Sequence, residues 1–297
     1  LNARIFLNGV PVGSHSNSFG PCRLEVSDAL VEGKNHLAVL IESGLYAAAE
    51  RIASDLDPRH PDGLLHKRMW LRKPQFQFGW DWNPRLINVG ISGPARLEWT
   101  DGVRIDQVSM FPELNDDHSQ AMLHVRFHVE NVTDGPLDVT FDAQVSGPGE
   151  AGNRVDVSLP TGRSTQSIMV PIEDPALWWP RTHGDQPLYD LDCRVMIGSE
   201  TVDEVKRRTG IRSIAIDQTG HPDEGSYFIL RVNGQPVFAK GGNWVPADMI
   251  MADVDEARYR KLIARAVEAN FNTLRVWGGG RYLDHTFLEL CDEAGIL

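Results

Sequence analysis

The sequence is short of cysteine, of positive charge and of long apolar runs, and each shortage excludes a class of protein. Its three cysteines, Cys22, Cys193 and Cys291, form no CxxC pair, so neither a disulfide framework nor a zinc ribbon is expected. The formal net charge of -12 argues against nucleic acid and anionic membrane partners, because both select basic patches. Because no run of roughly 18 apolar residues occurs, no transmembrane helix is predicted.

The sequence also lacks an initial methionine and a leader, since it begins Leu1-Asn2-Ala3. We therefore expect that the start was cut away or that a signal was removed, which leaves the compartment open. The missing disulfide pattern favours the cytoplasm. The 297 residues are 41% hydrophobic and 24% charged, as in a globular protein of two or three domains at about 100–200 residues each. The oligomeric state stays unknown.

Short strands and frequent turns mark the first segment, residues 1–100. Its first strand ends in Asn8-Gly9, a hairpin signal, and further strands are predicted at 22–26 and 35–41. Strands of this length with so many turns are typical of a β-sandwich or jelly roll. We therefore expect part of a jelly-roll-like β-sandwich here.

The second segment, residues 101–213, alternates apolar and polar residues more regularly. Leu123, Val125, Phe127 and Val129 share one face of a predicted strand. Glycine and proline turns separate this strand from those predicted at 137–145, 167–170 and 188–196. The pattern predicts an immunoglobulin-like β-sandwich.

The period of the pattern changes in the third segment, residues 214–297. A buried strand is predicted at 236–241, an amphipathic helix at 259–267 and a strand at 273–277. A second helix, capped by Asp284 and closed by Gly295, follows. Strand–helix–strand–helix order indicates parallel βα units. A (β/α)8 barrel takes about 250 residues, so we expect only its first units before the sequence ends.

Polar and aromatic side chains lie at the predicted ends of these parallel strands, where α/β folds bind their ligands. One strand ends at Asn243-Trp244, and the other at Arg275-Val276-Trp277. Period 2 places Arg275 and Trp277 on the same side of their strand. An inward-facing arginine needs carboxylate or hydroxyl partners. The alternative is a structural ion pair beside a packing tryptophan.

The stretch Trp80-Asp81-Trp82 places a carboxylate between two indoles. Indole faces fit the C–H face of a pyranose, and a carboxylate accepts hydrogen bonds from sugar hydroxyls, so a neutral ligand rich in hydroxyls suits the pattern. A core aromatic cluster with Asp81 in a turn is the structural alternative. In a strand both rings would share one face and Asp81 would point away. In a bulge or loop tip all three could converge.

Two further groups of residues have structural interpretations. The pair Trp178-Trp179 is expected to anchor a strand edge or a domain contact, with ligand binding as the alternative. Glu289, Asp292 and Glu293 are expected to form the solvated face of the last helix. We assign no chemistry to either group.

Four long motifs together resemble the β-mannosidases of glycoside hydrolase family 2. They are FGWDW at 78–82, LWWP at 177–180 followed by QPLY at 186–189, GGNWVPAD at 241–248 and NTLRVWGGG at 272–280. The resemblance covers nearly the whole chain, in the order of the family. It implies a partial sugar-binding-type β-sandwich over 1–100, an immunoglobulin-like β-sandwich over 101–213 and the truncated start of a catalytic (β/α)8 barrel over 214–297.

The resemblance implies a subsite for the terminal mannose. In the family the Trp-Asp-Trp loop reaches the mouth of the barrel. Carried over, Asp81 would hydrogen-bond mannose hydroxyls and Trp82 would line the pocket. Trp277 would lie beside the same sugar.

Three further residues are implied as parts of this site, and one position departs from the family. Arg275 would support the catalytic carboxylates, and Asn243 and Trp244 would form walls. Asn83 stands where the family leads us to expect glycine after the second tryptophan. A side chain there restricts the loop if a positive φ is needed, although asparagine tolerates that region well.

The function implied is that of a retaining exo-β-mannosidase, which removes terminal non-reducing β-D-mannose from an oligosaccharide. No metal or organic cofactor, nucleic acid or membrane is expected. Such enzymes need two carboxyl groups about 5–5.5 Å apart. The two glutamates of the family are expected beyond Leu297, so we assign no catalytic residue here and expect an inactive internal fragment. The alternatives are an exo-β-glucosaminidase or endo-β-mannosidase of the same family, or a non-catalytic carbohydrate-binding protein.

Overall fold

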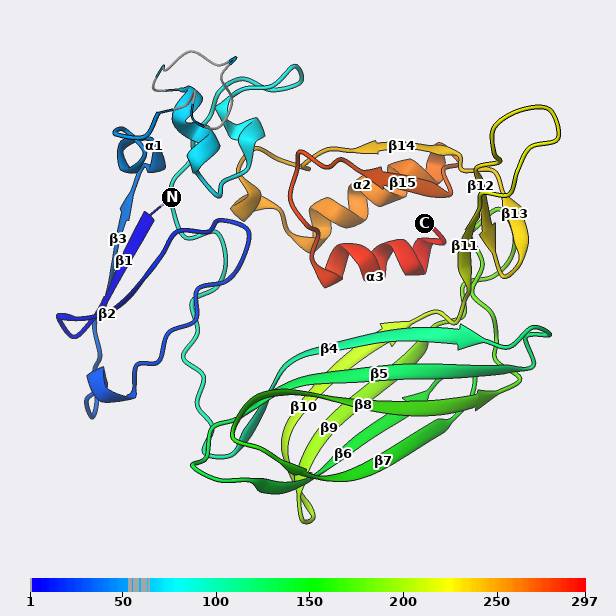
Figure 1. Cartoon of the computed structure of the whole chain (residues 1–297), viewed down its shortest axis with the longest axis horizontal. Coiled ribbons are helices and arrows are strands. Elements are labelled where there is room, and N and C mark those ends of the chain that lie inside the picture. Colours follow the sequence, from blue (N-terminus) through cyan, green and yellow to red (C-terminus); the bar gives the residue numbers. More distant parts are fainter. Residues whose placement is uncertain (1, 53–54, 56–58, 60–62, 64) are drawn as a thin grey trace. The chain divides into compact units, whose positions relative to one another are not determined.

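The computed structural model describes residues 2–52, 55, 59, 63 and 65–297, and the chain divides into two compact units (Figure 1). The first unit comprises Leu1–Ala95, Asn243–Arg258 and Val276–Leu283, and the second comprises Arg96–Gly242, Tyr259–Arg275 and Asp284–Leu297. Each unit therefore combines segments that lie far apart in the sequence. None of the helices in the described ranges has the length and apolar character needed to cross a membrane.

The first unit begins with a three-stranded antiparallel sheet. Its strands are β1 (Asn2–Leu7), β2 (Val10–His15) and β3 (Leu37–Glu42), in the order β2-β1-β3. Asn8 and Gly9 both have positive φ, 53° and 82°, as a two-residue type I′ hairpin requires. The predicted hairpin is confirmed. Alternate residues of β1, Ala3, Ile5 and Leu7, are buried on one face of the sheet.

The strand predicted at 22–26 is wrong, because this segment has no regular structure and leads into a 3-10 helix, η1 (Ser27–Ala29). Its last residues bond locally. The Glu25 carboxylate accepts from the amides of Val26 and Ser27, at 2.9 and 2.8 Å, and from the Ser27 hydroxyl at 2.6 Å. A side chain that takes up neighbouring amides competes with strand pairing. The other short helices here are α1 (Gly44–Ala47), η3 (His66–Trp70) and η4 (Gln75–Phe78).

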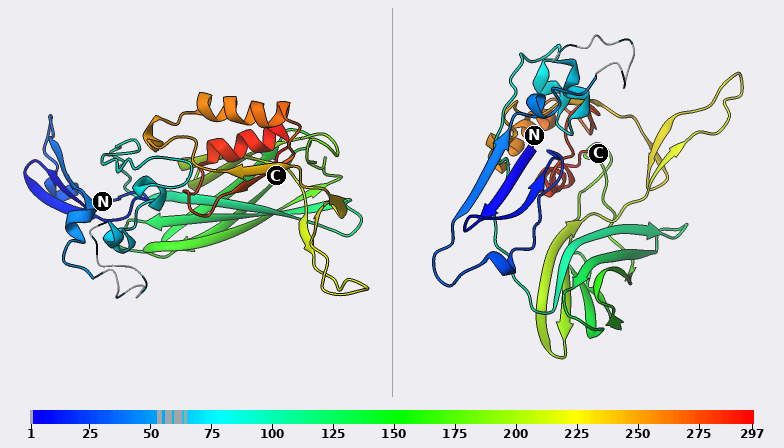
Figure 2. Two further views of the ribbon diagram at one scale, coloured as in Figure 1. Left: turned by 90° about the horizontal axis from the view of Figure 1, so that it is seen from above. Right: turned by 60° about the vertical axis from the view of Figure 1, so that its left-hand side comes forward.

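A β-sandwich with two facing antiparallel sheets forms most of the second unit (Figures 1 and 2). One sheet, in the order β4-β5-β8, contains β4 (Val103–Leu114), β5 (Gln120–Asn131) and β8 (Gly162–Glu173). The other, in the order β10-β9-β6-β7, contains β6 (Leu137–Ser146), β7 (Ala151–Leu159), β9 (Tyr189–Ile197) and β10 (Glu200–Thr209). Sheets of three and four strands are the arrangement of an immunoglobulin-like sandwich, and the predicted β-sandwich is confirmed.

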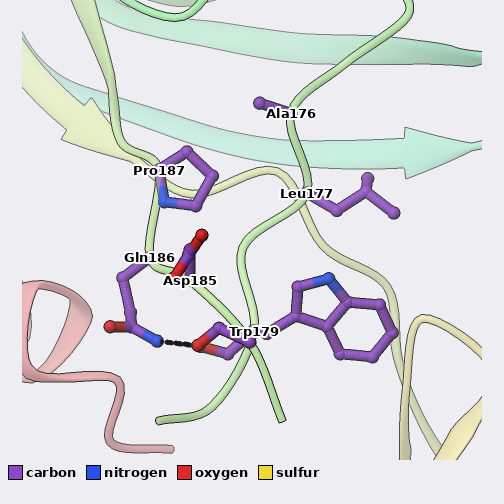
Figure 3. Close-up of a pocket in the computed structure, with 7 residues that line it drawn as sticks. Ala176, Leu177, Trp179, Asp185, Gln186 and Pro187 are labelled. Carbon is purple, nitrogen blue, oxygen red and sulfur yellow. Dashed lines mark hydrogen bonds between the residues drawn. The ribbon is translucent and has the colours of Figure 1, made fainter.

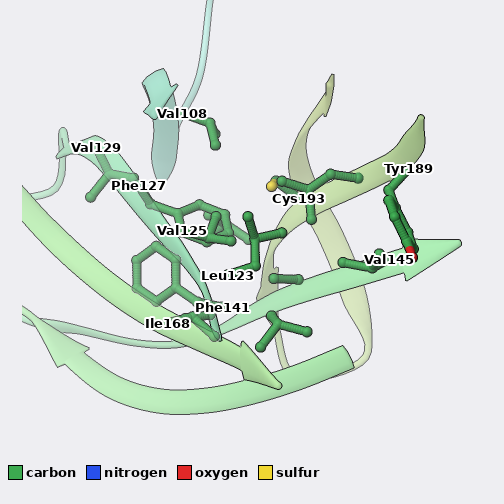
Figure 4. Close-up of a cluster of buried hydrophobic side chains, with 14 of the residues drawn as sticks. Val108, Leu123, Val125, Phe127, Val129, Phe141, Val145, Ile168, Tyr189 and Cys193 are labelled. Atoms are coloured by element: carbon green, nitrogen blue, oxygen red, sulfur yellow. The ribbon is translucent and has the colours of Figure 1, made fainter. Parts of the chain in front are cut away.

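The core of this sandwich lies between the two sheets (Figure 4). The predicted apolar face of β5 is buried, with 0–1% exposure at Leu123, Val125, Phe127 and Val129. Phe127 meets Phe141 of the other sheet edge to face, with ring centroids 5.1 Å apart. Period-2 alternation therefore places the inward side chains of both sheets in one cluster.

A small antiparallel sheet follows the sandwich. It consists of β11 (Ile214–Asp217), β12 (Ile229–Val232) and β13 (Gln235–Val237). The buried strand predicted at 236–241 is therefore wrong as one element, because β13 ends early and Phe238 is 79% exposed. Asn233 and Gly234, both with positive φ, form a tight turn that pairs β13 back onto β12. The remaining residues of the predicted strand lead into the next sheet.

The next sheet is a parallel pair, β14 (Gly241–Trp244) and β15 (Thr273–Val276). The amide of Thr273 donates to the carbonyl of Lys240 at 3.2 Å, and the amide of Trp277 donates to the carbonyl of Trp244 at 3.0 Å. Both partners advance along the chain together, so the strands are parallel. At Gly241 an added Cβ would overlap the carbonyl oxygen of Thr273. Glycine therefore permits the close approach of the two strands.

Each strand of this pair is followed by a helix, α2 (Glu256–Glu268) or α3 (His285–Ala294). The Asp284 carboxylate accepts from the amide of Phe287, and Gly295 closes α3 at φ 68°, so both predicted caps are confirmed. The Leu297 amide donates to Asn272 and its carbonyl accepts from Leu274, which places Leu297 parallel to β15. The described residues do not show a barrel, so the barrel start stays a prediction.

Trp178 joins the sandwich to α3. Its indole is fully buried, and its Nε1 donates to the Asp292 carbonyl at 2.8 Å. The Arg212 guanidinium lies 4.3 Å from the indole centroid and pairs with the Asp292 carboxylate at 2.9 Å. Glu293 pairs with Arg208 and Arg260. The anchoring role expected for Trp178 is confirmed. The solvated face expected for Asp292 is wrong, because its carboxylate is half-buried and pairs with Arg212, whereas Glu293 is exposed as expected and pairs with arginines at the surface.

Candidate functional site

The Trp80-Asp81-Trp82 stretch forms a tight turn directly after η4. Phe76 and Phe78 bury their rings, with 0% and 2% exposure, and so fix η4 in the first unit. Gly79 then adopts φ 106° and ψ 138°, a conformation that residues with a Cβ rarely adopt. The amide of Trp80 donates to the carbonyl of Asn83 at 3.2 Å and closes the turn. The chain therefore reverses within four residues.

Three indoles meet at this turn. Trp277, which follows β15, belongs to the same compact unit as the turn. Its ring centroid lies 5.3 Å from that of Trp80 and 6.0 Å from that of Trp82, with the second pair edge to face. Trp82 also packs against Phe76, at 5.5 Å. The buried phenylalanine, Trp82, Trp277 and Trp80 thus form a continuous aromatic contact chain.

The bond from the Trp80 amide to the Asn83 carbonyl closes a turn within four residues, and this turn excludes the strand alternative. Trp80, Asp81 and Trp82 are all exposed, by 48% for Trp80 and 36% for Trp82, and both rings contact one partner. Exposed indole surface beside an exposed carboxylate is the combination that a sugar ring with its hydroxyls can use.

Gly279, two residues after Trp277, packs against the indole ring of Trp277. An added Cβ on Gly279 would overlap the Cζ2 and Cη2 atoms of that indole, so the backbone of Gly279 lies in close contact with the ring. The neighbouring Gly278 would meet no atom within 4 Å. The glycine run at 278–280 therefore has one member that the aromatic cluster requires.

We expect Gly279→Ala to displace the Trp277 ring, because the methyl group and the indole compete for one space. Overpacking of this kind costs about 1–3 kcal/mol. The change is measured as a loss of near-ultraviolet circular dichroism from the coupled indoles, together with a lower urea midpoint. Gly278→Ala is the matched control and should leave both unchanged. Equal spectra for the two variants would contradict the close packing.

The remaining predicted site residues lie on the two parallel strands. Asn243 and Trp244 end β14, Asn243 exposed and Trp244 half-buried, and the Trp244 carbonyl accepts from the Trp277 amide. Arg275 is an exposed residue of β15 and belongs to the second unit. The support of catalytic carboxylates by Arg275 and the wall roles of Asn243 and Trp244 stay predictions.

A buried cation lies in the first unit as well. Lys73 is 6% exposed, and burial lowers the pKa of its ammonium group. Its Nζ donates to the carbonyl of Asn88 at 2.8 Å, and the Asn88 side chain donates to the carbonyl of Met249 at 2.9 Å. These bonds connect the segment that carries the turn to the segment that follows β14.

Sequence reasoning missed Phe76, Gly279 and the contact of Trp80 with Trp277. The signal for Phe76 was weak, since a phenylalanine before a turn is ordinary. For Gly279 the glycine run was visible, but only the folded chain shows which glycine lies against a ring. The contact of Trp80 with Trp277 depends on the geometry of the turn, which no sequence motif indicates.

Other parts of the chain offer less chemistry. Among the residues that the structure describes, no group of three or more His, Cys, Asp and Glu side chains could hold a metal ion. Burial raises the pKa of the Cys193 and Cys291 thiols to about 12, which keeps both protonated and unreactive.

An open hollow beside Trp179 lies in the second unit (Figure 3). It is lined by Ala176, Leu177, Trp179, Gly184, Asp185, Gln186 and Pro187. Gln186 donates to the carbonyls of Trp179 and Gly184, at 3.0 and 2.6 Å, and the Trp179 amide donates to the carbonyl of Asp185 at 2.9 Å. These bonds stabilise the loop itself, and we assign no ligand to the hollow.

Two family models match the chain. The model described as "glycosyl hydrolase 2 galactose-binding domain-like" matches residues 1–93, and the model described as "glycosyl hydrolases family 2" matches residues 103–212. The β-mannosidase B of Aspergillus fumigatus is 31% identical over 99% of this chain. The enzyme of the same name from Thermothelomyces thermophilus is 32% identical, also over 99% of this chain. The chain spans 35% and 34% of the lengths of these two relatives.

Solved structures give the same relationship. The β-D-mannosidase from Dictyoglomus thermophilum superposes on 100% of this chain with a TM-score of 0.88 and 35% identity, and the match covers 36% of that enzyme. The exo-chitosanase of Amycolatopsis orientalis shares the fold, with a TM-score of 0.69 and 20% identity over 100% of this chain and 31% of its own. The chain therefore belongs to glycosyl hydrolase family 2.

Proposed function

We propose that this chain is part of a retaining exo-β-mannosidase that removes terminal non-reducing β-D-mannose from oligosaccharides. The observation that carries the proposal is the turn at Trp80-Asp81-Trp82, whose two exposed indoles both contact Trp277. The similarity to β-mannosidases over 99–100% of the chain supports the same substrate class.

The turn supplies the contacts of the terminal mannose. The Asp81 carboxylate accepts hydrogen bonds from sugar hydroxyls, and its negative charge strengthens those bonds. Trp82 and Trp277 cover the C–H face of the sugar ring. This face gains apolar contact, while the sugar hydroxyls at the other positions keep their hydrogen bonds to water. A mannose bound in another orientation would lose both the hydrogen bonds to Asp81 and the apolar contact with the two indoles.

Residues at the strand ends complete the site. Asn243 and Trp244 of the first unit form its wall, and the family resemblance gives Arg275 a role of its own, which is to hold the catalytic carboxylates by charge-assisted hydrogen bonds. The parallel pair β14 and β15, each followed by a helix, supports residues 214–297 as the first part of a (β/α)8 barrel. Residues 1–100 and 101–213 are then the partial sugar-binding-type and the immunoglobulin-like sandwiches.

The chemistry is a double displacement between two carboxyl groups. One carboxylate attacks the anomeric carbon while the other, protonated, gives its proton to the leaving oxygen, and water later hydrolyses the mannosyl-enzyme. The relatives are about three times as long as this chain, and we propose that both carboxyl groups lie in the part of the enzyme outside these 297 residues. We therefore assign no catalytic residue and no cofactor to the chain.

Parallel hydrolysis assays on the full-length enzyme test this function. We expect turnover of p-nitrophenyl β-D-mannopyranoside at least tenfold faster, in kcat/KM, than turnover of the β-D-glucosaminide. The 297-residue chain alone should release no nitrophenol from either substrate. Faster hydrolysis of the glucosaminide would replace the mannosidase by an exo-β-glucosaminidase, and hydrolysis of neither would favour an endo-acting enzyme or a carbohydrate-binding protein. Release by the short chain would contradict the placement of the carboxyl groups.

A further inference from the structure

Asn83 occupies the position where the family resemblance leads us to expect glycine, and its side chain donates hydrogen bonds to two backbone carbonyls. We propose that Asn83 is a positioning residue that holds the Trp80-Asp81-Trp82 turn against Trp277. The proposal rests on the proposed function, because the turn matters for catalysis only as a mannose subsite. Asn83 itself is 8% exposed and is not one of the sugar contacts.

The side chain of Asn83 binds two backbone carbonyls. Its Nδ2 donates to the carbonyl of Phe76 at 2.9 Å and to that of Pro84 at 2.8 Å. Only the nitrogen of an amide group can donate, so two carbonyl acceptors fix which way the amide points. The backbone carbonyl of Asn83 also accepts from the Trp80 amide. The residue therefore closes the turn with its backbone and ties it to η4 with its side chain.

The carbonyls at the end of η4 all receive donors from the returning chain. After the bond from Asn83 to Phe76, the Leu86 amide donates to the carbonyl of Gln77 at 3.0 Å, and the Arg85 Nε donates to that of Phe78 at 3.3 Å. The last carbonyls of a short helix need such partners, and the carbonyl of Phe76 accepts from the Gly79 amide, at 3.0 Å, as well as from Asn83. Of these three donors, Asn83 is the nearest in sequence to Trp82, so its loss frees the end of the turn that carries Trp82.

Glycine at this position could not make these bonds. Among the described residues with positive φ, Asn83 is absent, so the turn does not need the conformational freedom of glycine here. Asparagine can therefore replace glycine without strain and adds the bond to Phe76, whose ring packs on Trp82. Backbone and ring of the same phenylalanine thus hold two successive residues of the loop.

Asn83→Gly in the full-length enzyme is the main test, with two measurements. Amide hydrogen exchange in peptides that cover residues 79–88 should become about tenfold faster, because the backbone bonds of the Trp80 and Leu86 amides open more often once the Asn83 side chain no longer ties the turn to η4. The KM for p-nitrophenyl β-D-mannopyranoside should rise about tenfold with kcat nearly unchanged, because a mobile turn weakens binding of substrate and transition state alike.

Asn83→Asp adds a signature that depends on pH. A carboxylate would face two carbonyl oxygens, whereas the protonated acid can still donate one hydrogen bond. Burial and the two oxygens favour the neutral form, so the pKa of the introduced carboxyl is expected to be raised. The protection of residues 79–88 in this variant, relative to the parent at the same pH, should therefore fall as pH rises through that pKa. A protection ratio that does not change with pH overturns the proposal, even if Asn83→Gly fails to fold.

Asn35→Gly is the matched control. Asn35 also donates its Nδ2 to two backbone carbonyls, those of Val31 and Gly33, but in a turn that carries no indole. It should leave both the exchange of residues 79–88 and the KM unchanged. Parent-like exchange in Asn83→Gly, or faster exchange with an unchanged KM, overturns the proposal. If the parent enzyme hydrolyses no mannoside and Asn83→Gly still exchanges faster, the result contradicts the proposed function but not the positioning role of Asn83.

Discussion

Asp81→Ala in the full-length enzyme is expected to lower kcat/KM for p-nitrophenyl β-D-mannopyranoside by about a hundredfold or more. Asp81 is exposed at the tip of the turn between two indoles that contact Trp277. A carboxylate there can accept hydrogen bonds from two hydroxyls of one sugar. Each hydrogen bond to a charged group contributes about 1.5–3 kcal/mol, and about 1.4 kcal/mol corresponds to a tenfold change.

The matched control for this prediction is Asp116→Ala. Asp116 is likewise an exposed aspartate in a turn, but it lies between β4 and β5 of the sandwich. The control should keep parental kcat/KM, and both variants should keep the parental melting temperature, because neither carboxylate is buried. Asp81→Asn should lose less than Asp81→Ala, since an amide oxygen still accepts hydrogen bonds without the charge. If Asp81→Ala kept the parental kcat/KM, the aromatic turn would have a role in packing only and not in sugar binding.

Gly241→Ala is expected to have the largest effect on stability, with a loss of about 3 kcal/mol or more. The added Cβ would overlap the carbonyl oxygen of Thr273, a backbone atom that cannot rotate away. Relief of this overlap requires β14 and β15 to separate, which breaks the bond from the Thr273 amide to the Lys240 carbonyl. Overpacking costs about 1–3 kcal/mol where side chains can adjust, and more where they cannot.

Two measurements test this prediction on the 297-residue chain. The melting temperature should fall by about 6 °C or more, at about 2–4 °C for each kcal/mol, and amides of residues 272–277 should exchange faster. Gly242→Ala is the control in the same strand, because its Cβ would meet only Phe271, at an ordinary 3.5 Å. Similar melting of the two alanine variants would show that β14 and β15 do not need the close approach.

Predictions from the sequence succeeded where the signal was local or repeated. The period-2 face of β5 and the caps of α3 at Asp284 and Gly295 are such cases. The alternation reflects a strand with one buried face, and the caps satisfy helix ends within a few residues. Neither depends on distant parts of the chain.

Predictions failed where a neighbouring group changed the pairing. At 22–26, bonds from the Glu25 carboxylate to nearby amides replace a ladder. At 236–241, the turn at Asn233-Gly234 takes the first residues of the predicted strand into another sheet. Asp292 does not lie on a solvated face, because it contacts Arg212 and Trp178. Both come from distant parts of the chain, which the periodic pattern of the helix does not include.

By itself the sequence determined the β-sandwich of the second segment, the two helices of the third segment with the strand between them, and the membership of a family, since these follow from periodicity and from long motifs. It also named Trp80, Asp81, Trp82 and Trp277 as residues of interest. Only the tertiary structure decided that the stretch is a turn and that both of its indoles contact Trp277. The contacts join residues from separate segments, and their geometry depends on a backbone reversal at Gly79 and on bonds from Asn83 that no periodic pattern records.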